Sequence, residues 1–375
     1  MSSIQYHSVD PQAVKVYGEG QVADFIINNQ RNIINGSVRL EGELRITIDG
    51  TNRPAKDADI GPNGTPTNLI YYNANTGAHN LIEAINFSRG GQNKEFLNNY
   101  GRLVNMVEKS SKSRNDYFNT EDLVELKVAL HEDALMLSKG FSSGTNPRVV
   151  SDVDFSFKPL CCLNRMNAPS LSLSDSNSEC KLSFTFSQNN AFLVGENVAN
   201  NSSYEIRNLR LTYRSADPSP TPNVLSRSYV PLKLLLNNDN SSIQTSAPVV
   251  ADAVSVSFLL SAHENNNTQN NVALHRPPAV DRMSFLFNSN TSEFITYEMK
   301  DVSEMIAKGL ESMKSAGFNQ TNPNKYAGND GFIVGAPFDS QVDLSNQKFQ
   351  FDFVSGISPA FPYLAFLYFH NVIEV

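Results

Sequence analysis

The sequence predicts a mainly β protein with two jelly-roll domains in tandem, each an eight-stranded β-sandwich, and a few short helices between the strands. Segments of alternating apolar and polar residues recur along the chain, which is typical of strands that bury one face. Phenylalanine and tyrosine are plentiful, with 23 and 13 copies, and their rings pack well on pleated sheets. The length of 375 residues suits two domains of about 150–200 residues each.

The first half opens with a polar stretch and continues with strands. Residues 1–20 contain scattered proline and glycine and no apolar pattern, so we expect an irregular amino-terminal arm. In INGSVRLEGELRITIDG (34–50), apolar and polar residues alternate around a Glu41-Gly42-Glu43 break, which we interpret as a β-bulge in a strand or strand pair. Further strands are predicted in FSFKPL, KLSFTFS and YEIRNLRLTYRS, which begin at Phe155, Lys181 and Tyr204.

Residues 80–108 combine a strand, a turn and a helix. LIEAINF is the predicted strand, and the turn covers 89–93. A helix is expected to begin near Lys94 or Glu95, because apolar residues then recur at spacings of three and four. These residues are Phe96, Tyr100, Leu103, Val104 and Val107. A second helix is expected from Thr120, where two acidic residues follow at the positive end of the helix dipole.

A proline-rich segment, ADPSPTPN, separates the two halves and is typical of a stiff linker. The order of strand, polar turn, Glu-Phe pair and helix recurs on both sides of it, which favours two related β domains. We therefore expect an amino-terminal arm at 1–20, a first jelly roll at 21–215, a linker at 216–224 and a second jelly roll at 225–375.

The second half repeats the pattern of strands and one helix. Strands are predicted in SYVPLKLLL, AVSVSFLLSA, KFQFDFVSG and FPYLAFLYFHNVIEV, and a hairpin in RMSFLFNSNTSEFITYEM. A helix should begin at Asp301, which forms a capping box with Glu304, and should end at Gly317. FPYLAFLYF is apolar at nearly every position and is our candidate for a central strand buried on both faces.

Asparagine makes up about an eighth of the chain and gathers in runs, where its tolerance of turn conformations predicts loops. We expect such loops to cluster at the barrel ends, at 51–68, 237–246, 263–278 and 319–330.

The charge and cysteine content narrow the class of protein. A net charge of −8 argues against direct nucleic-acid binding, which needs a basic surface. We expect no signal peptide, and the longest apolar run falls short of the roughly 20 residues of a membrane-spanning helix. Three cysteines, two of them adjacent, predict buried free thiols made in a reducing compartment rather than a disulfide framework.

No catalytic constellation is present in the sequence. His131-Glu132 has Leu135 where a zinc-protease helix needs its second histidine, and the Asp57-Ala-Asp59 segment lacks the closing glutamate of a calcium loop. The six histidines are scattered, and no phosphate-binding glycine loop or nucleophile elbow occurs. We therefore expect no enzyme and no cofactor, with no catalytic, cofactor-binding or metal-binding residue.

Several segments resemble one known protein family. Lys158-Pro159-Leu160, Ala168–Leu171, the alternating strand Leu182–Phe186 and Tyr204–Leu211 are similar to the later strands of the first barrel in double jelly-roll major capsid proteins. GAHNLIEAINFSRGGQNKEFLNNYGRL resembles the strand, turn and helix of the same barrel. The family is the lineage of adenovirus, small lipid-containing bacteriophages, virophages and polinton-like viruses. The resemblance covers 35–213, and the second half matches it mainly in the order of elements.

The resemblance implies a viral major capsid protein whose trimers form pseudo-hexameric capsomers that tile an icosahedral shell. Its implied partners are two further copies of the chain, neighbouring capsomers, penton and minor capsid proteins, with an internal membrane as a candidate contact of the arm at 1–20. It would be made in the host cytoplasm and reside in the virion, with no direct sequence-specific binding to nucleic acid. We expect the strand-to-helix unit at 80–108 to cover a sheet edge and to shape the flank that meets a neighbouring copy.

Two other classes stay open at the level of sequence. One is a viral spike, penton or receptor-binding β protein, which would share the composition and the lack of catalytic residues. The other is a β-sandwich enzyme that acts on glycans with acidic residues from separate strands.

Overall fold

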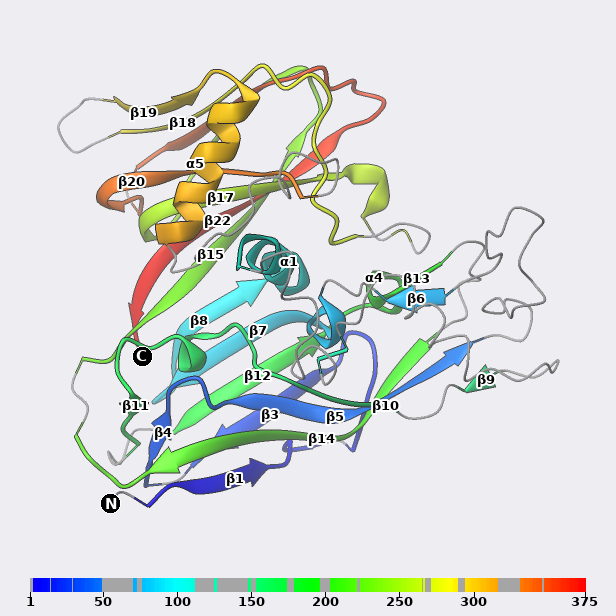
Figure 1. Ribbon diagram of the computed structural model, residues 1–375, viewed down its shortest axis with the longest axis vertical. Coiled ribbons are helices and arrows are strands. Elements are labelled where there is room, and N and C mark those ends of the chain that lie inside the picture. The colour runs from blue at the N-terminus through cyan, green and yellow to red at the C-terminus, as the bar shows by residue number, and fades with distance from the viewer. Residues whose placement is uncertain are drawn as a thin grey trace.

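The computed structural model of the chain describes residues 3–13, 15–28, 30–48, 70–72, 76–111, 125–126, 148–149, 153–173, 179–195, 203–220, 223–264, 266, 271–288, 294–315, 331–345 and 347–375. The strands form two sandwiches that lie one above the other along the longest axis of the molecule (Figure 1). Their strand pairs are antiparallel, as in jelly rolls. The predicted fold class is confirmed.

The first sandwich, which we call the first jelly roll, contains sheets of eight, four and two described strands. Its strands are β1 (Gln5–Val9), β2 (Val16–Tyr17), β3 (Val22–Ile27), β4 (Asn32–Ile34), β5 (Arg39–Ile48), β6 (Ile70–Tyr72), β7 (Ile82–Arg89), β8 (Gln92–Asn98), β9 (Arg148–Val149), β10 (Val153–Phe157), β11 (Ser170–Leu171), β12 (Cys180–Phe186), β13 (Leu193–Gly195) and β14 (Ser203–Ala216). The largest sheet has the order β10-β5-β14-β4-β11 with β1, β2 and β9 beside it, and it faces the sheet β3-β12-β7-β8.

The second jelly roll has two four-stranded sheets, β15-β22-β17-β20 and β16-β21-β18-β19. Its strands are β15 (Leu225–Leu236), β16 (Asn240–Thr245), β17 (Val250–Leu260), β18 (Arg282–Asn288), β19 (Phe294–Met299), β20 (Ile333–Asp343), β21 (Phe349–Val354) and β22 (Tyr363–Glu374). The predicted hairpin is present as β18 and β19, and FPYLAFLYF lies in the central strand β22 as expected. Sheet pairing in the described residues therefore keeps β1–β14 separate from β15–β22.

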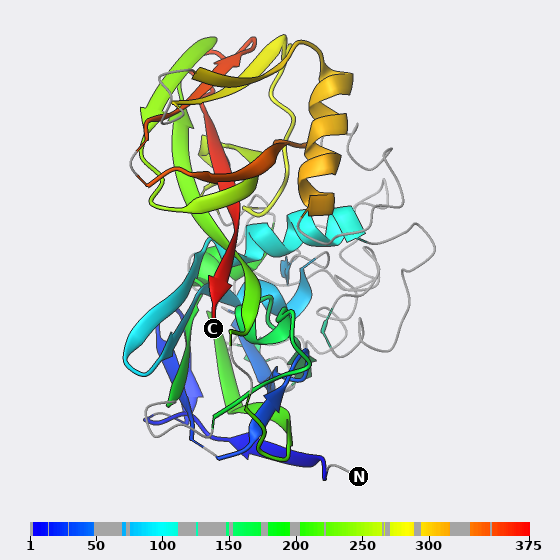
Figure 2. The same cartoon turned by 90° about the vertical axis from the view of Figure 1, so that its left-hand side faces the viewer.

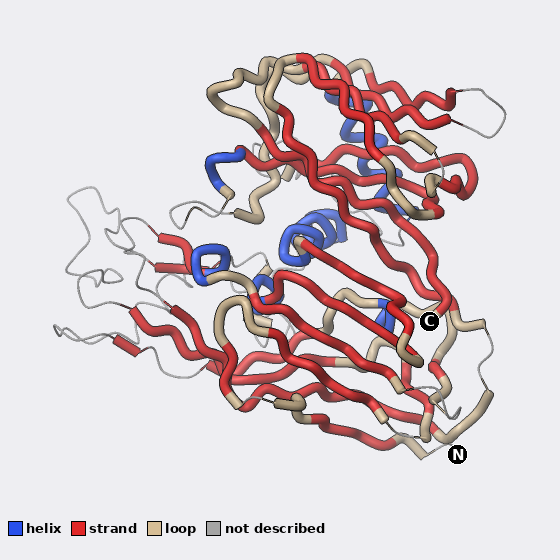
Figure 3. The backbone as a smooth tube through the Cα atoms, turned by 180° about the vertical axis from the view of Figure 1, so that it is seen from behind, coloured by secondary structure: helices blue, strands red, loops and turns tan. Residues whose placement is uncertain are grey.

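Helices are short and few in the described chain. They are η2 (Gly77–Leu81), α1 (Tyr100–Ser111), η3 (Cys162–Asn164), α4 (Asn189–Phe192), η4 (Ser261–His263) and α5 (Val302–Ser315). α5 packs along β20 and β17, while α1 lies between the two jelly rolls (Figures 2 and 3). The predicted capping box is confirmed, because Glu304 N–H donates to Asp301 Oδ1 and Lys300 N–H donates to Glu304 Oε2, both at 2.9 Å. None of the described helices combines the length and the apolar character needed to cross a bilayer.

The two apolar cores meet at β22. Its side chains at Ala365, Leu367 and Phe369 point into the core of the second jelly roll, between its sheets. The alternate side chains Phe366 and Tyr368 belong to the core cluster that fills the first jelly roll and the space around α1. A strand buried on both faces needs apolar residues at successive positions, which explains the unbroken apolar run.

The predicted start of the first helix is wrong. Residues 92–98 form β8, which pairs with β7, and α1 begins only at Tyr100. Gly90 and Gly91 have φ of +56° and +75° and form the tight turn between these strands. Phe96 is 51% exposed whereas Leu97 is buried, so this segment alternates with the two-residue period of a strand.

The predicted bulge lies in the partner strand instead. Arg207 pairs with Glu43 and Arg210 with Glu41, so two residues of β14 face Gly42. Asn208 takes φ of +47° there, a conformation that asparagine tolerates better than most residues.

Part of the expected amino-terminal arm also forms regular secondary structure. β1 pairs with β14 at the margin of the largest sheet, so the expected irregular conformation is wrong for 5–9. Ser3 and Arg31 both bond to Asp217, which fixes the chain just before β1. The expected loop at 237–246 contains β16. The helix expected from Thr120 is wrong at 125–126, which form a turn with Leu126 at φ of +57°. The segments 51–68 and 319–330, Thr120 itself and the predicted end of the second helix at Gly317 lie outside the described residues.

Candidate functional site: the junction between the jelly rolls

α1 connects the first jelly roll to the second through polar side chains in its first turns. Arg102, which is 3% exposed, donates from Nη1 to the carbonyl oxygen of Ala273 at 2.7 Å and from Nη2 to that of Asn271. Asn105 donates through Nδ2 to the carbonyl oxygen of Val272 at 2.7 Å. One helix of the first half therefore donates hydrogen bonds to three successive carbonyl groups of the second half.

The residues around the start of α1 permit this close approach. A Cβ atom on Gly101 would lie 2.3 Å from Asn80 Oδ1 and 3.4 Å from Val272 Cγ1, so a larger residue would separate the helix from both neighbours. Asn99 precedes the helix with φ of +52°, and its carbonyl oxygen accepts a bond from Tyr368 Oη at 3.1 Å. The Arg102 guanidinium then lies over the ring of Phe366, 4.3 Å from the centroid.

A buried carboxyl group forms the second contact between the rolls. Glu95 of β8 is 4% exposed, and its Oε2 accepts the backbone N–H of Cys162 at 2.8 Å. Its Oε1 lies 2.6 Å from Ser228 Oγ in β15. Burial raises the pKa of Glu95, and the two hydrogen bonds oppose that rise in part.

Backbone pairing adds a third contact beside Glu95. Asn167 N–H donates to the carbonyl oxygen of Leu225 at 2.8 Å, and Leu225 N–H donates to Asn167 Oδ1 at 3.0 Å. Met166 and Ser226 form an isolated antiparallel bridge. We use the term junction for these three contacts together, namely Arg102 and Asn105 with 271–273, Glu95 with Ser228, and 162–167 with 225–228.

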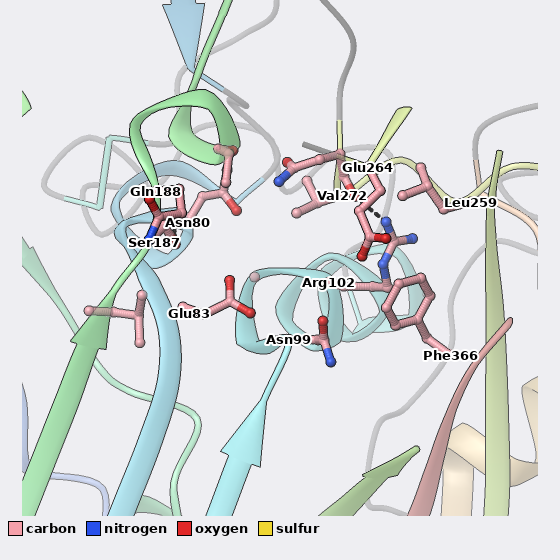
Figure 4. Close-up of a pocket in the computed structure, with 14 residues that line it drawn as sticks. Asn80, Glu83, Asn99, Arg102, Ser187, Gln188, Leu259, Glu264, Val272 and Phe366 are labelled. Carbon is pink, nitrogen blue, oxygen red and sulfur yellow. Dashed lines mark hydrogen bonds between the residues drawn. The ribbon is translucent and has the colours of Figure 1, made fainter. Parts of the chain in front are cut away.

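A cavity of about 250 Å³ lies beside the first turn of α1 (Figure 4). Glu83 lies on one side of it, and Arg102, Glu264 and Phe366 lie on the other. Burial raises the pKa of Glu83, the negative charge of Glu264 adds to the rise, and the positive charges of Lys233 and Arg102 oppose it. Glu264 itself is paired with Lys233.

The cavity offers no nucleophile with an adjacent base. The Arg102 nitrogens Nη1 and Nη2 are directed to backbone carbonyls, and the acidic side chain of Glu83 is the group best suited to hold a proton there. Within the described ranges, no three His, Cys, Asp or Glu side chains are grouped so as to hold a metal ion. The described side chains of the junction therefore form a contact that joins the two rolls.

The described cysteines and histidines that the sequence analysis considered are packed in several parts of the fold. Cys161, Cys162 and Cys180 are free and buried, as predicted, and burial raises the pKa of each thiol. His79 is buried against Tyr100, and His263 and His275 pack ring to ring with centroids 4.8 Å apart. The segments His131-Glu132 and Asp57–Asp59 lie outside the described residues.

The expected role of the strand-to-helix unit is wrong for its helix. Nearly all of α1 is buried inside the chain, between the two jelly rolls, so the helix does not form an outer flank that meets a neighbouring copy. β8 is the outer strand of its sheet and has exposed residues, so a contact of this strand with a neighbouring copy stays a prediction. The sequence reasoning also missed Glu95 and Arg102 as contact residues. No local signal marked Glu95, because its neighbours are Lys94 and Phe96 and its partner Ser228 lies 133 residues further along the chain.

Comparison with known proteins identifies the fold. No family model and no curated protein matches the sequence. Among solved structures, the Faustovirus major capsid protein has a TM-score of 0.60 at 10% identity, with 100% of this chain and 91% of that chain covered. A chain of the Sputnik virophage has a TM-score of 0.58 at 9% identity, with 99% and 85% covered. A chain of the PBCV-1 virus capsid has a TM-score of 0.54 at 10% identity, with 100% and 95% covered.

These similarities extend over both jelly rolls and over nearly the full length of the compared chains. The chain thus has the double jelly-roll fold found in these viral proteins, as its sequence resemblance indicated.

Proposed function

We propose that this chain is a viral major capsid protein, and that three copies form a capsomer with a nearly hexagonal outline. The observation that carries the proposal is the match of both jelly rolls, in one continuous alignment, to a Faustovirus protein that is a major capsid protein. Three chains with two similar barrels each place six barrels around a threefold axis. Such a block can tile a closed shell, and its task is to present matching edges to neighbours.

The absence of a reaction centre at the junction is consistent with this structural role. The side chains that meet there hold backbone carbonyls and hydroxyl groups, and they fix the orientation of one roll against the other. A rigid pair of barrels is what a repeating shell unit needs, because small rotations between the barrels would accumulate across neighbouring copies. We infer that the chain acts as a structural protein of the virion rather than as an enzyme.

The boundaries and partners of the two rolls are part of the same proposal. We assign 21–215 to the first roll, 216–224 to the linker and 225–375 to the second roll, with the arm at 1–20 adding β1 and β2 to the largest sheet of the first roll. Neighbouring capsomers, penton and minor capsid proteins are the proposed partners, with synthesis in the host cytoplasm. Ile4 and Tyr6 expose large apolar surfaces, and Tyr6 is 81% exposed, so the arm at 1–20 offers a contact to a minor protein or to lipid.

Electron microscopy of the purified protein in negative stain tests the proposal. Class averages along the symmetry axis should show hexagon-like particles with threefold symmetry, and light scattering should give the mass of three chains. Slender three-lobed particles would instead indicate a spike or penton protein. Monomers that cleave polysaccharides would indicate the glycan-acting enzyme and would overturn the capsid proposal.

A further inference from the structure

Glu95 connects the two jelly rolls through one carboxyl group. Its Oε2 accepts the Cys162 N–H of the first roll at 2.8 Å, and its Oε1 lies 2.6 Å from the Ser228 hydroxyl of the second roll. The segment around Cys162 is itself tied to β15, because Ser226 Oγ donates to the Cys162 carbonyl oxygen at 2.7 Å. The Glu95 carboxyl group therefore lies where β15 meets the segment 162–167.

Both hydrogen-bond partners of Glu95 are neutral. Among the described residues, no lysine, arginine or histidine forms an ion pair with it. Arg165 acts on it through space, and the Arg165 guanidinium lies over the Tyr229 ring, 4.9 Å from the centroid. A buried carboxylate with two neutral donors and no paired cation is destabilised relative to the same group in water.

The other titratable groups that face Glu95 stay uncharged near neutral pH. They come from α1, from the segment at η3 and from β15, and burial raises the pKa of each. These groups are Tyr100, Cys161, Cys162 and Tyr229. Behind Tyr229, His370 is neutral in the same range, because burial lowers its pKa to about 3. Of the groups named around Glu95, only Glu95 itself and Arg165 can therefore carry charge near neutral pH.

We propose that Glu95 is a proton-linked contact between the two jelly rolls. The closed junction binds the proton of Glu95 more tightly than the open junction does, so a rise in pH weakens the attachment of β15 to 162–167. The contact is a property of the single chain, and it does not depend on the proposed role in a capsid.

Proton binding to Glu95 and opening of the junction are linked, and this determines whether a rise in pH strengthens or weakens the junction. When the junction opens, the carboxyl group meets water and returns to the ordinary range of a glutamate, near 4.5. As the pH rises through this range the open form loses its proton before the closed form does, because burial raises the pKa of Glu95 in the closed form. Between the pKa of Glu95 in the open form and its pKa in the closed form, each unit of pH lowers the ratio of closed to open junction by up to about tenfold.

Hydrogen exchange of the backbone amides tests this on the full chain. Three backbone amides donate hydrogen bonds across the junction, those of Asn167, Leu225 and Arg227. Their protection, corrected for the intrinsic exchange rate, should fall between pH 5 and pH 8 in the wild-type protein, by about tenfold for each unit by which burial raises the pKa of Glu95. In Glu95→Gln the amide group can accept the Cys162 N–H and donate to the Ser228 hydroxyl without titrating, so the fall should be threefold or less. The matched control is Glu179→Gln at an exposed glutamate, which should retain the wild-type pH dependence.

A second measurement keeps the test independent of how well the variant folds. Infrared difference spectra of the wild-type protein should show the carbonyl band of a protonated, buried carboxylic acid that is lost as the pH rises. Glu95→Gln should lose the Glu95 component of this band, whereas Glu83→Gln, which removes a half-buried acid with a raised pKa beside the cavity, should retain it. A wild-type pH dependence of exchange in Glu95→Gln, or the absence of the band at pH 5, would overturn the proposal.

Discussion

Replacing Arg102 by alanine removes the largest polar contact between the jelly rolls. The guanidinium makes two hydrogen bonds to carbonyl oxygens, and a charged donor contributes about 1.5–3 kcal/mol per bond. Its position over Phe366 contributes about 0.5–2 kcal/mol more. Water from the adjoining cavity can reach part of the freed backbone, so we expect the lower part of this range, a loss of about 3–5 kcal/mol. That is a large share of the roughly 5–15 kcal/mol that stabilises a folded protein.

Urea unfolding followed by circular dichroism measures this loss, since the chain has no tryptophan to report by fluorescence. Arg102→Lys retains the charge but cannot reach both carbonyls, so its midpoint should lie between those of the wild type and Arg102→Ala. The matched control is Arg276→Ala, whose guanidinium contacts the Phe332 ring at 5.9 Å, and we expect a change below about 1 kcal/mol. A loss below about 1 kcal/mol in Arg102→Ala would refute the reasoning that this side chain holds the rolls together.

Three further outcomes are expected. In Gly335→Ala the new Cβ would lie 2.3 Å from the Val254 carbonyl oxygen and 2.4 Å from Ser312 Oγ. The free energy of unfolding should therefore fall by about 2–3 kcal/mol. In the control Gly18→Ala the nearest atom lies 3.6 Å from the new Cβ, so the free energy of unfolding should change little. In Asp301→Ala the loss of the cap should destabilise the protein by about 1 kcal/mol, and Asp301→Ser should restore most of it; equal midpoints for both variants would contradict the cap. The thiols of Cys161, Cys162 and Cys180 should resist alkylation at pH 8 in the folded protein and react fully in urea, because burial raises their pKa. Rapid labelling without urea would show that the described packing is incorrect.

Much of the architecture could be predicted because local patterns determine it. Alternation identified β12 and β14, and the capping box placed the start of α5. The unbroken apolar run at 361–369 indicated a strand buried on both faces, which is β22. These signals depend on neighbouring residues alone, so they can be recognised without knowledge of the rest of the fold.

The junction could not be predicted because its partners are far apart in sequence. Arg102 bonds to a carbonyl 171 residues away, and Glu95 bonds to Ser228 at a separation of 133 residues. In the sequence, Glu95 and Phe96 fitted a helix that continues into 100–111, and only the pairing of β8 with β7 shows that this stretch is a strand. Nothing in the residue types of α1 distinguishes a helix buried between two sandwiches from one that covers an outer edge.

The shared core around β22 has a consequence for how the protein forms. The first jelly roll is complete in its strands by residue 216, but its apolar cluster also takes in Leu364, Phe366 and Tyr368. During synthesis, the surface around α1 that these side chains will cover stays open to water until the ribosome has made the last strand. Until the whole second half has been synthesised, this apolar surface of a new chain can associate with other proteins. A fragment that stops at the linker should therefore bind chaperones or aggregate.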